Sequence, residues 1–256
     1  LPLAKAIKEA GAKAAVTYYI LPQVWAWKPK RVSVVERYCD NLASILPFDS
    51  KFYSRSTYVG HPLMDEIKLK KTSLSSSGKV AFLPGSRRSE ISRLMPVYRE
   101  LAKKIEAKRL LVVPPFLLDK VGEIYGDVSD FDIVSNTPEA LYESDFAFVC
   151  SGTATLEAAL IGTPFVLAYK SKAIDVFIAR KFVKIKHAGL ANIMFDFMGK
   201  EPLHEEFIQE FATAENLLRA YKSCDRHKFL KGCDELRAYL GHGSSKNVVK
   251  ILKHME

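Results

Sequence analysis

The chain contains few cysteines and no long run of apolar residues. No apolar stretch approaches the roughly 20 residues that a bilayer-spanning helix needs, which indicates a soluble or peripheral protein. The four cysteines show neither the spacing of metal ligands nor a dense disulfide pattern; they are Cys39, Cys150, Cys224 and Cys233. We therefore expect free thiols in a reducing compartment.

The N-terminus lacks both an initiating methionine and a secretory signal, and the chain opens directly on a helical pattern. This opening suggests a fragment of a longer protein. The 256 residues suffice for one large or two small domains with real cores. The net charge of +9 favours anionic partners: nucleic acid, acidic lipid surfaces or phosphorylated small molecules. Because the basic residues are spread along the chain, nucleic acid is not specifically indicated.

Short apolar, β-prone runs alternate with helical patterns, which predicts an α/β fold built from parallel βαβ units. The strands that we expect cover residues 14–20, 42–46, 57–59, 80–83, 109–113, 131–134, 145–150 and 164–168. The helices that we expect cover residues 3–10, 48–53, 89–104, 154–161, 173–184, 213–221, 225–240 and 244–254, with one more from about Pro29. Residues 68–79 read as a polar linker between two α/β units, and 186–200 receive no assignment. Two such units should face each other across a cleft.

The stretch 143–164 carries the first candidate site. A buried strand ends in Ser151-Gly152-Thr153, and a helix follows from Ala154. Such a turn presents free backbone N–H groups to an anion. Glu157 falls one helical turn after Thr153, where a carboxylate suits the vicinal diol of a ribose. The pattern indicates a nucleotide site, and an ordinary strand-to-helix joint remains the alternative. The residues assigned to this side of the site are Ser151, Gly152, Thr153, Ala154, Thr155 and Glu157.

A second turn follows the strand 80–83 and reads Pro84-Gly85-Ser86-Arg87-Arg88-Ser89-Glu90. Cations in the first turn of a helix oppose its dipole, and a bound anion would remove that conflict. Arg87 and Arg88 therefore read as diphosphate contacts, with Gly85 allowing close approach of the backbone. The alternative is that both arginines simply reach solvent; the second phosphate-type turn favours ligand binding. The assigned residues are Gly85, Ser86, Arg87, Arg88 and Glu90.

Other candidates stand alone. His61 follows a strand where the chain leaves the first unit, and catalysis there is weighed against a structural hydrogen bond. Asn192 is a polar residue in an apolar setting, whose amide could contact a base, sugar or acyl amide or cap a turn. Aromatic and basic residues in one loop suit a lipid headgroup or sugar phosphate, or pack as core; they are Trp25, Trp27, Lys28, Lys30 and Arg31. No histidine has metal-ligand spacing, so no metal site is expected.

Several motifs together resemble the lipid-A-disaccharide synthase family. They are VWAWKPKRV, YVGHPLMDEI, FLPGSRRSEISRLMP, SGTATLEAALIGTPFVLAY and IARKFVKIK. The resemblance implies a GT-B fold of two Rossmann-like units, the first incomplete. It divides the chain into an acceptor-side part (1–61), a donor-binding domain (62–240) and a C-terminal helix returning to the first domain (241–256). It places Glu157 on the ribose and Asn192 near the donor.

The resemblance also implies a reaction. The family transfers 2,3-diacylglucosamine from UDP to the 6-hydroxyl of 2,3-diacylglucosamine 1-phosphate, with inversion and without metal or cofactor, in lipid A biosynthesis of Gram-negative bacteria. It implies a cytoplasmic protein, peripheral on the inner membrane, and is compatible with a homodimer. This chain departs from the family at His187 and Ala191, where Tyr and Pro are usual. The family has a longer N-terminal section that is expected to hold the general base.

Two other functions stay open from the residues. One is another UDP-sugar enzyme of the same fold, such as a transferase for soluble sugars or an epimerase. The other is a non-catalytic module that binds a nucleotide sugar or docks on a membrane. The acyl specificity that would separate the first alternative from the family is not visible in these residues.

Overall fold

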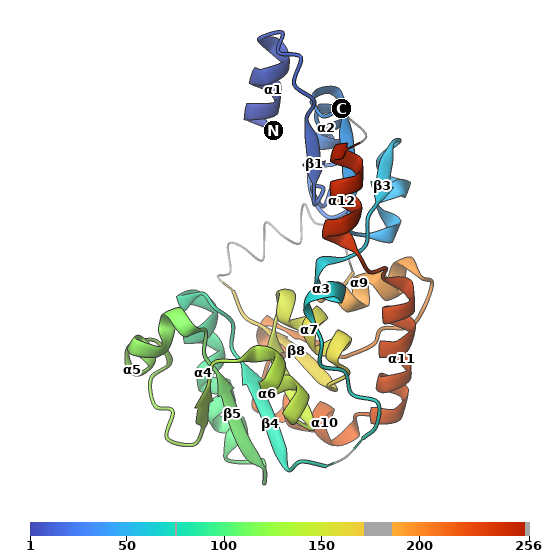
Figure 1. Ribbon diagram of the computed structural model, residues 1–256. Coiled ribbons are helices and arrows are strands. Elements are labelled where there is room, and N and C mark those ends of the chain that lie inside the picture. The colour runs from blue at the N-terminus through green and yellow to red at the C-terminus, as the bar shows by residue number, and fades with distance from the viewer. Residues whose placement is uncertain (75, 172–185, 254–256) are drawn as a thin grey trace. The chain divides into compact units, whose positions relative to one another are not determined.

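The computed structural model describes residues 1–74, 76–171 and 186–253, which form two compact units (Figure 1). The first unit holds Leu1–Glu66 and the C-terminal segment from Arg237, and the second holds residues 67–171 and Lys186–Leu236. The helix predicted over 173–184 lies outside the described residues. In the described chain no helix combines the length and apolar character needed to cross a membrane, and the four cysteines are free thiols.

The first unit contains a three-stranded parallel sheet in the order β1-β2-β3. Its strands are β1 (Thr17–Tyr19), β2 (Asn41–Ser44) and β3 (Ser56–Tyr58). Its helices are α1 (Pro2–Glu9), α2 (Arg31–Tyr38), the 3-10 turn η1 (Pro47–Lys51), α3 (Pro62–Glu66) and α12 (Ser244–Lys253). Val35 of α2 is completely buried against Leu42 and Tyr53 in the small core of this unit. The strand predicted over 14–20 shortens to three residues.

The helix α12 belongs to the first unit through a specific cap. The carboxylate of Asp65 in α3 accepts hydrogen bonds from the backbone N–H groups of Gly243 and Ser244, each at 2.8 Å. An acidic group at this position satisfies N–H groups that the helix leaves unpaired and complements its dipole. The Ser244 hydroxyl also lies 2.9 Å from the Tyr19 hydroxyl. The C-terminal segment therefore completes the unit that the N-terminal segment begins.

The second unit is built on a six-stranded parallel sheet in the order β6-β5-β4-β7-β8-β9. The strands are β4 (Lys79–Leu83), β5 (Lys108–Val112), β6 (Asp132–Val134), β7 (Phe146–Cys150), β8 (Phe165–Tyr169) and β9 (Glu206–Ile208). The helices are α4 (Arg88–Ala102), α5 (Val121–Tyr125), α6 (Thr137–Glu143), α7 (Thr153–Ile161), α9 (Leu190–Phe197), α10 (Ala214–Ser223) and α11 (Arg226–Tyr239), with 3-10 turns η2 (Pro115–Lys120) and η3 (Gln209–Phe211). The prediction of parallel α/β units is confirmed.

The core of this unit is aromatic. Phe82 of β4 and Phe148 of β7 are fully buried, with ring centroids 5.1 Å apart, and Tyr98 of α4 packs edge-on against Phe82 at 5.4 Å. Burying one such side chain contributes about 1.5–3 kcal/mol. The central strands are apolar on both faces because helices cover both, with α4 against α10 and α6 against α7 (Figure 1).

Two segments of the second unit also differ from the sequence-based expectation. In the polar segment, residues 68–74 and 76–78 are irregular but anchored, since the Asp145 carboxylate accepts hydrogen bonds from the backbone N–H groups of Ser77 (2.7 Å) and Gly78 (2.8 Å). The edge strand β9 was not predicted at all. Its residues lie in a segment where charged and polar residues interrupt the apolar ones, so no apolar run of strand length is visible.

Candidate functional site

The strand order places the two candidate turns side by side. From β4 the chain builds outward through β5 and β6, then returns to the opposite side of β4 to form β7. The register pairs Leu83 with Val149, so both strands end at the same edge. This reversal is a topological switch point, where parallel α/β sheets bind ligands at the carboxyl ends of their strands. The turn after Leu83 and the turn after Cys150 therefore share one site.

The turn after β4 is shaped by Gly85. Its φ of +99° is a conformation that side chains other than glycine rarely adopt. A Cβ atom there would come within 2.6 Å of Glu90 Oε2 and 3.2 Å of Cys150 Sγ. Gly85 thus brings the β4 turn against the end of β7. From the sequence we expected Gly85 to let a ligand approach the backbone closely. In the structure, its close neighbours are Glu90 and Cys150.

The arginines at the start of α4 have different partners. Arg87 Nη1 lies 2.7 Å from Glu90 Oε1, and Arg88 Nη2 lies 2.7 Å from Glu123 Oε1. Both arginine side chains are largely exposed, and so is Ser86. Glu90 is buried and, as an anion, would repel a phosphate. Its assignment as a ligand contact is therefore corrected: Glu90 holds Arg87.

The turn after β7 leads into α7 without a side-chain cap. Gly152 is the N-cap residue, and a Cβ atom built there would meet nothing within 4 Å. Gly152 and Thr153 are exposed, and the N–H groups at the start of α7 are available to an anion. Glu157 is half-buried one turn further along. The assignment of Thr155 as a ligand contact is corrected. Its side chain is fully buried and its hydroxyl donates to Gly152 O at 2.8 Å, so Thr155 shapes the turn.

A thiol and a phenol lie beside this site. Burial, with a smaller contribution from Glu90, raises the pKa of Cys150 to about 12. Burial first and Glu90 second also raise the pKa of Tyr169 at the end of β8. Both groups are therefore neutral near pH 7, and Cys150 offers no thiolate nucleophile. Among the described residues, the charged groups at the two turns include Arg87, Arg88, Glu90 and Glu157.

Asn192 is completely buried and its amide is fully engaged by protein groups. Nδ2 donates to His204 O at 2.9 Å and to Glu206 Oε1 at 2.8 Å. Oδ1 accepts from the backbone N–H groups of Leu203 (2.8 Å) and His204 (3.2 Å). An amide has two donors and two acceptor positions, and all four are used. The expectation that Asn192 contacts the sugar-donor substrate directly is therefore corrected. Its side chain instead braces the segment before β9.

His61 receives a structural role in the first unit. Its ring is buried, Nδ1 accepts a hydrogen bond from Leu63 N at 3.3 Å, and its backbone N–H donates to Gly241 O. Burial lowers its pKa to about 4, so the ring is neutral near pH 7. Trp25 is core, packed edge-on against Phe48 with centroids 5.5 Å apart.

The rest of the aromatic and basic loop faces solvent. Trp27 is half-buried, and Lys28 Nζ lies 5.3 Å from its ring centroid. Lys30 and Arg31 are exposed. This loop therefore splits between core and surface, with Trp25 inside and the basic residues outside.

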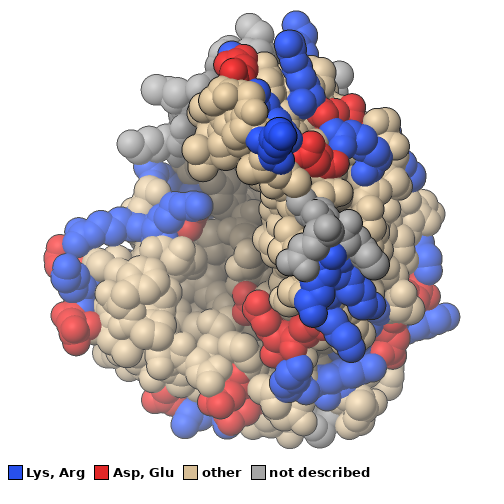
Figure 2. Space-filling model, turned by 45° about the horizontal axis from the view of Figure 1, so that its top comes forward, with Lys and Arg blue, Asp and Glu red and all other residues tan. Residues whose placement is uncertain are grey.

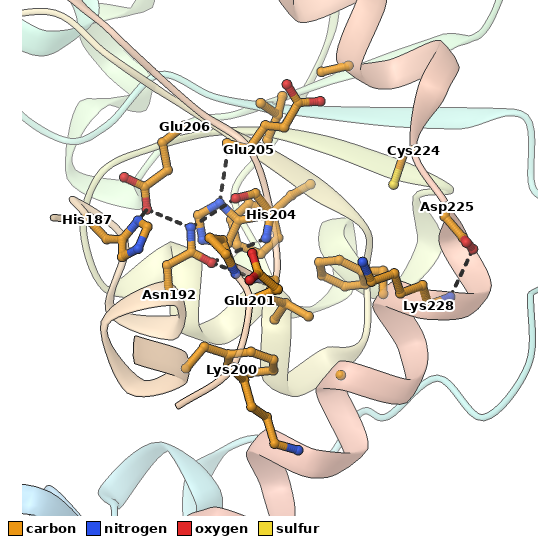
Figure 3. A pocket seen from close by; sticks show the side chains of 18 of the residues that line it. His187, Asn192, Lys200, Glu201, His204, Glu205, Glu206, Cys224, Asp225 and Lys228 are labelled. Atoms are coloured by element: carbon orange, nitrogen blue, oxygen red, sulfur yellow. Dashed lines mark hydrogen bonds and ion pairs between the residues drawn. The ribbon is translucent and has the colours of Figure 1, made fainter. Parts of the chain in front are cut away.

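Sequence reasoning missed a group of side chains around Glu206. Figure 3 shows His187, Asn192 and Glu206 directed toward one another at one end of a pocket of about 820 Å³. Glu206 belongs to an ordinary Glu-Glu pair in a segment without a recognisable pattern, so no local signal marked it. Among the residues that the structure describes, no group of three or more His, Cys, Asp or Glu could hold a metal ion.

Comparison with known proteins adds a family and a fold. The family model described as lipid-A-disaccharide synthetase matches residues 1–235. The lipid-A-disaccharide synthase of Campylobacter jejuni subsp. jejuni serotype O:2 is 56% identical over 264 residues, covering 100% of this chain and 72% of its own. That of Helicobacter pylori strain 26695 is 47% identical and covers 97% of this chain and 73% of its own.

Solved structures of other proteins share the architecture. MurG of Acinetobacter baumannii has a TM-score of 0.56 at 15% identity, covering 99% of this chain and 70% of its own. A co-structure of S. aureus MnaA with UDP has a TM-score of 0.59 at 12% identity, covering 98% and 70%. These likenesses concern the fold alone, which is that of GT-B glycosyltransferases.

Proposed function

The chain belongs to the lipid-A-disaccharide synthase family, glycosyltransferases of lipid A biosynthesis, and we propose that its second unit binds the donor UDP-2,3-diacylglucosamine. The observation that carries this proposal is the pair of open turns at the switch point. Two helices, α4 and α7, begin there without side-chain caps, and Arg87 and Arg88 stand beside them. Backbone N–H groups and guanidinium groups together suit a diphosphate.

The reaction that we propose is transfer of the diacylglucosamine unit to the 6-hydroxyl of 2,3-diacylglucosamine 1-phosphate. The C–O bond to UDP breaks with inversion, so negative charge develops on the leaving diphosphate. Arg87 and the N–H groups of the Gly152–Thr153 turn would stabilise that charge without a metal ion. Glu157 would hold the ribose. The general base is assigned to the section of the relatives that this chain does not cover.

Binding is tested by calorimetric titration of this chain with UDP and, for comparison, ADP. We expect heat with UDP and a lower affinity for ADP. The absence of heat with UDP, or no change on Arg87→Ala, would contradict the site. Adding EDTA should leave UDP binding and transfer unchanged, and loss of either would contradict metal-free catalysis.

Turnover is tested separately, with the lipid monosaccharide phosphate as acceptor. We expect transfer by a protein that includes the N-terminal section of the relatives, and little by the 256-residue chain. Robust turnover by the shorter chain would refute the placement of the base. Formation of an epimerised UDP-sugar without acceptor would instead favour an epimerase.

We also propose that the first unit docks on the cytoplasmic face of the inner membrane. Lys28, Lys30 and Arg31 are exposed beside Trp27, a combination that suits anionic headgroups. On the face shown in Figure 2, basic side chains are interspersed with acidic ones, unlike the continuous patch typical of a nucleic-acid site. Vesicles containing anionic lipid should retain the protein, and Trp27→Ala with Lys28→Ala should weaken retention. Equal retention by neutral vesicles would argue against this role.

A further inference from the structure

One peptide unit connects the β7 turn to the opposite edge of the sheet. The Ser151 hydroxyl donates to Ala188 O at 3.3 Å, and the N–H of Gly189, in the same peptide unit, donates to Glu206 Oε1 at 3.0 Å. Ser151 follows β7 and Glu206 begins β9, with β8 between these strands. The Ala188–Gly189 peptide therefore bridges the end of β8 and is held at both of its polar ends.

The Glu206 carboxylate is the centre of this bridge. Its side chain is only 10% exposed. Oε2 accepts from Ala188 N at 2.7 Å, and Oε1 also accepts from Asn192 Nδ2 at 2.8 Å. His187 Nδ1 lies 3.9 Å from Oε1 (Figure 3). A buried carboxylate that accepts several N–H bonds is held rigidly, and these bonds are stronger than neutral ones.

Two further contacts leave this arrangement little freedom. A Cβ atom on Gly189 would lie 2.8 Å from the ring of His204, so the backbone passes tightly over that ring. Asn192 ties Glu206 to the segment before β9 through its bond to His204 O. The His204 ring itself lies against Phe165 of β8, with centroids 4.2 Å apart. The Ala188–Gly189 peptide is therefore held by its hydrogen bonds and also by its close packing against the His204 ring.

We propose that Glu206 is a positioning residue for the nucleotide diphosphate. It fixes the Ala188–Gly189 peptide, whose carbonyl holds the Ser151 hydroxyl and thereby the Ser151-Gly152-Thr153 turn in its anion-binding conformation. This inference rests on the proposed function of that turn. Glu206 itself accepts N–H groups at the start of α9 and takes no part in the chemistry.

The test is Glu206→Gln in the 256-residue chain, with Glu205→Gln as the matched control. The amide keeps the shape of Glu206 but removes its charge and places a donor against N–H groups. The side chain of the preceding residue, Glu205, forms an exposed 3.6 Å ion pair with Arg219. We expect E206Q to raise the Kd for UDP roughly tenfold, as for loss of a charge-assisted hydrogen bond, and E205Q to leave it unchanged. Uridine, which has no phosphate, should bind both variants alike.

Amide hydrogen exchange tests the bridge without a ligand. Exchange at Ala188 and Gly189 should accelerate in E206Q and not in E205Q. Unchanged exchange, or an equal loss of uridine and UDP affinity, would overturn the proposal. A further outcome separates the two proposals. If the wild-type chain binds no UDP but exchange still accelerates in E206Q, the bridge exists and the proposed function fails. The positioning role for the diphosphate is then refuted as well.

A double-mutant cycle provides a second variant. Ser151→Ala cuts the bridge at its other end, should itself weaken UDP and spare uridine, and is testable even if E206Q does not fold. Because both substitutions act through one peptide, the double variant should raise the UDP Kd by less than the product of the two single fold-changes. Independent effects would contradict the coupling between Glu206 and Ser151.

Discussion

The guanidinium of Arg87 and the carboxylate of Glu90 lie 2.7 Å apart, yet their side chains are 77% and 8% exposed. A buried anion thus holds an exposed cation at the first turn of α4. Because the guanidinium is exposed, solvent screens the interaction and its contribution to stability is small. The ion pair instead orients Arg87. Glu90 holds the guanidinium in place near Gly85, and its remaining N–H groups stay available to a ligand.

Removal of Arg87 should weaken UDP binding more than any other single change at this turn. We expect Arg87→Ala to raise the Kd about tenfold to a hundredfold, as for loss of charge-assisted hydrogen bonds. Arg87→Lys should restore only part, because an ammonium lacks the planar fork. Arg93→Ala is the control, because this half-buried arginine lies further along α4 and donates to Ser89 O. Calorimetry measures all three, and equal affinities for R87A and R93A would contradict the assignment.

Substitution of Gly85 should show how closely the two turns approach. Gly85 and Gly78 both have positive φ, +99° and +68°, but a Cβ atom on Gly78 would meet nothing within 4 Å. Gly78→Ala should cost about 1 kcal/mol of unfolding free energy from backbone strain alone. Gly85→Ala should cost more and also lower UDP affinity, because the new methyl displaces Glu90. Denaturant unfolding compares them, and equal costs would mean that Glu90 moves aside freely.

The pH dependence of stability should include a contribution from Asp49 in the first unit. Burial raises the pKa of Asp49 to about 6, against the lowering effect of the Ser44 hydrogen bond. The folded state therefore holds a proton that the unfolded state releases near pH 4. This stability is present at low pH and is lost as pH rises through 6.

The size of that loss follows from the two pKa values. At about 1.4 kcal/mol per pKa unit, the wild type should lose roughly 2 kcal/mol between pH 4 and 7 relative to Asp49→Asn. Urea unfolding at both pH values measures the difference. Parallel curves for the two proteins would show that Asp49 titrates normally.

Asn192 should contribute to the stability of the fold, because its amide pairs with buried protein groups. Asn192→Ala leaves several buried polar groups unpaired and should cost about 3 kcal/mol of unfolding free energy. Asn192→Asp places a second carboxylate beside Glu206 and should also lower the unfolding free energy, because it brings like charges together. Asn216→Ala, which removes one exposed bond to Phe211 O, is the control. Full stability of N192A would contradict the bracing role.

Local chemistry allowed the two turns to be found from the sequence. Gly85 and the Ser151-Gly152-Thr153 turn each interrupt an apolar strand just before a helix, and the physical demands of such a turn involve neighbours along the chain. Residues inside those turns were harder to assign. Thr155 and Glu90 lie within two residues of exposed ones, and only packing against the sheet sends their side chains inward.

Long-range partners explain what was missed. Glu206 is unremarkable beside Glu205, and it acquires a role because β9 adds to the edge of the sheet next to β8. Asn192 was placed near the donor, but its partners at 203–206 fill its amide. A hydrogen bond between residues more than ten positions apart leaves no periodic signal.

The sequence by itself determined the α/β class, the family and the positions of the two turns proposed to bind an anion, because strand and helix periods and turn residues are local properties. The tertiary structure decided which residues of those turns are exposed and which are buried. It did so by pairing β4 with β7 at the switch point and by bringing Glu206 across β8 to the Ala188–Gly189 peptide. Burial and charge pairing depend on which strands become neighbours, and no single stretch of the chain specifies that.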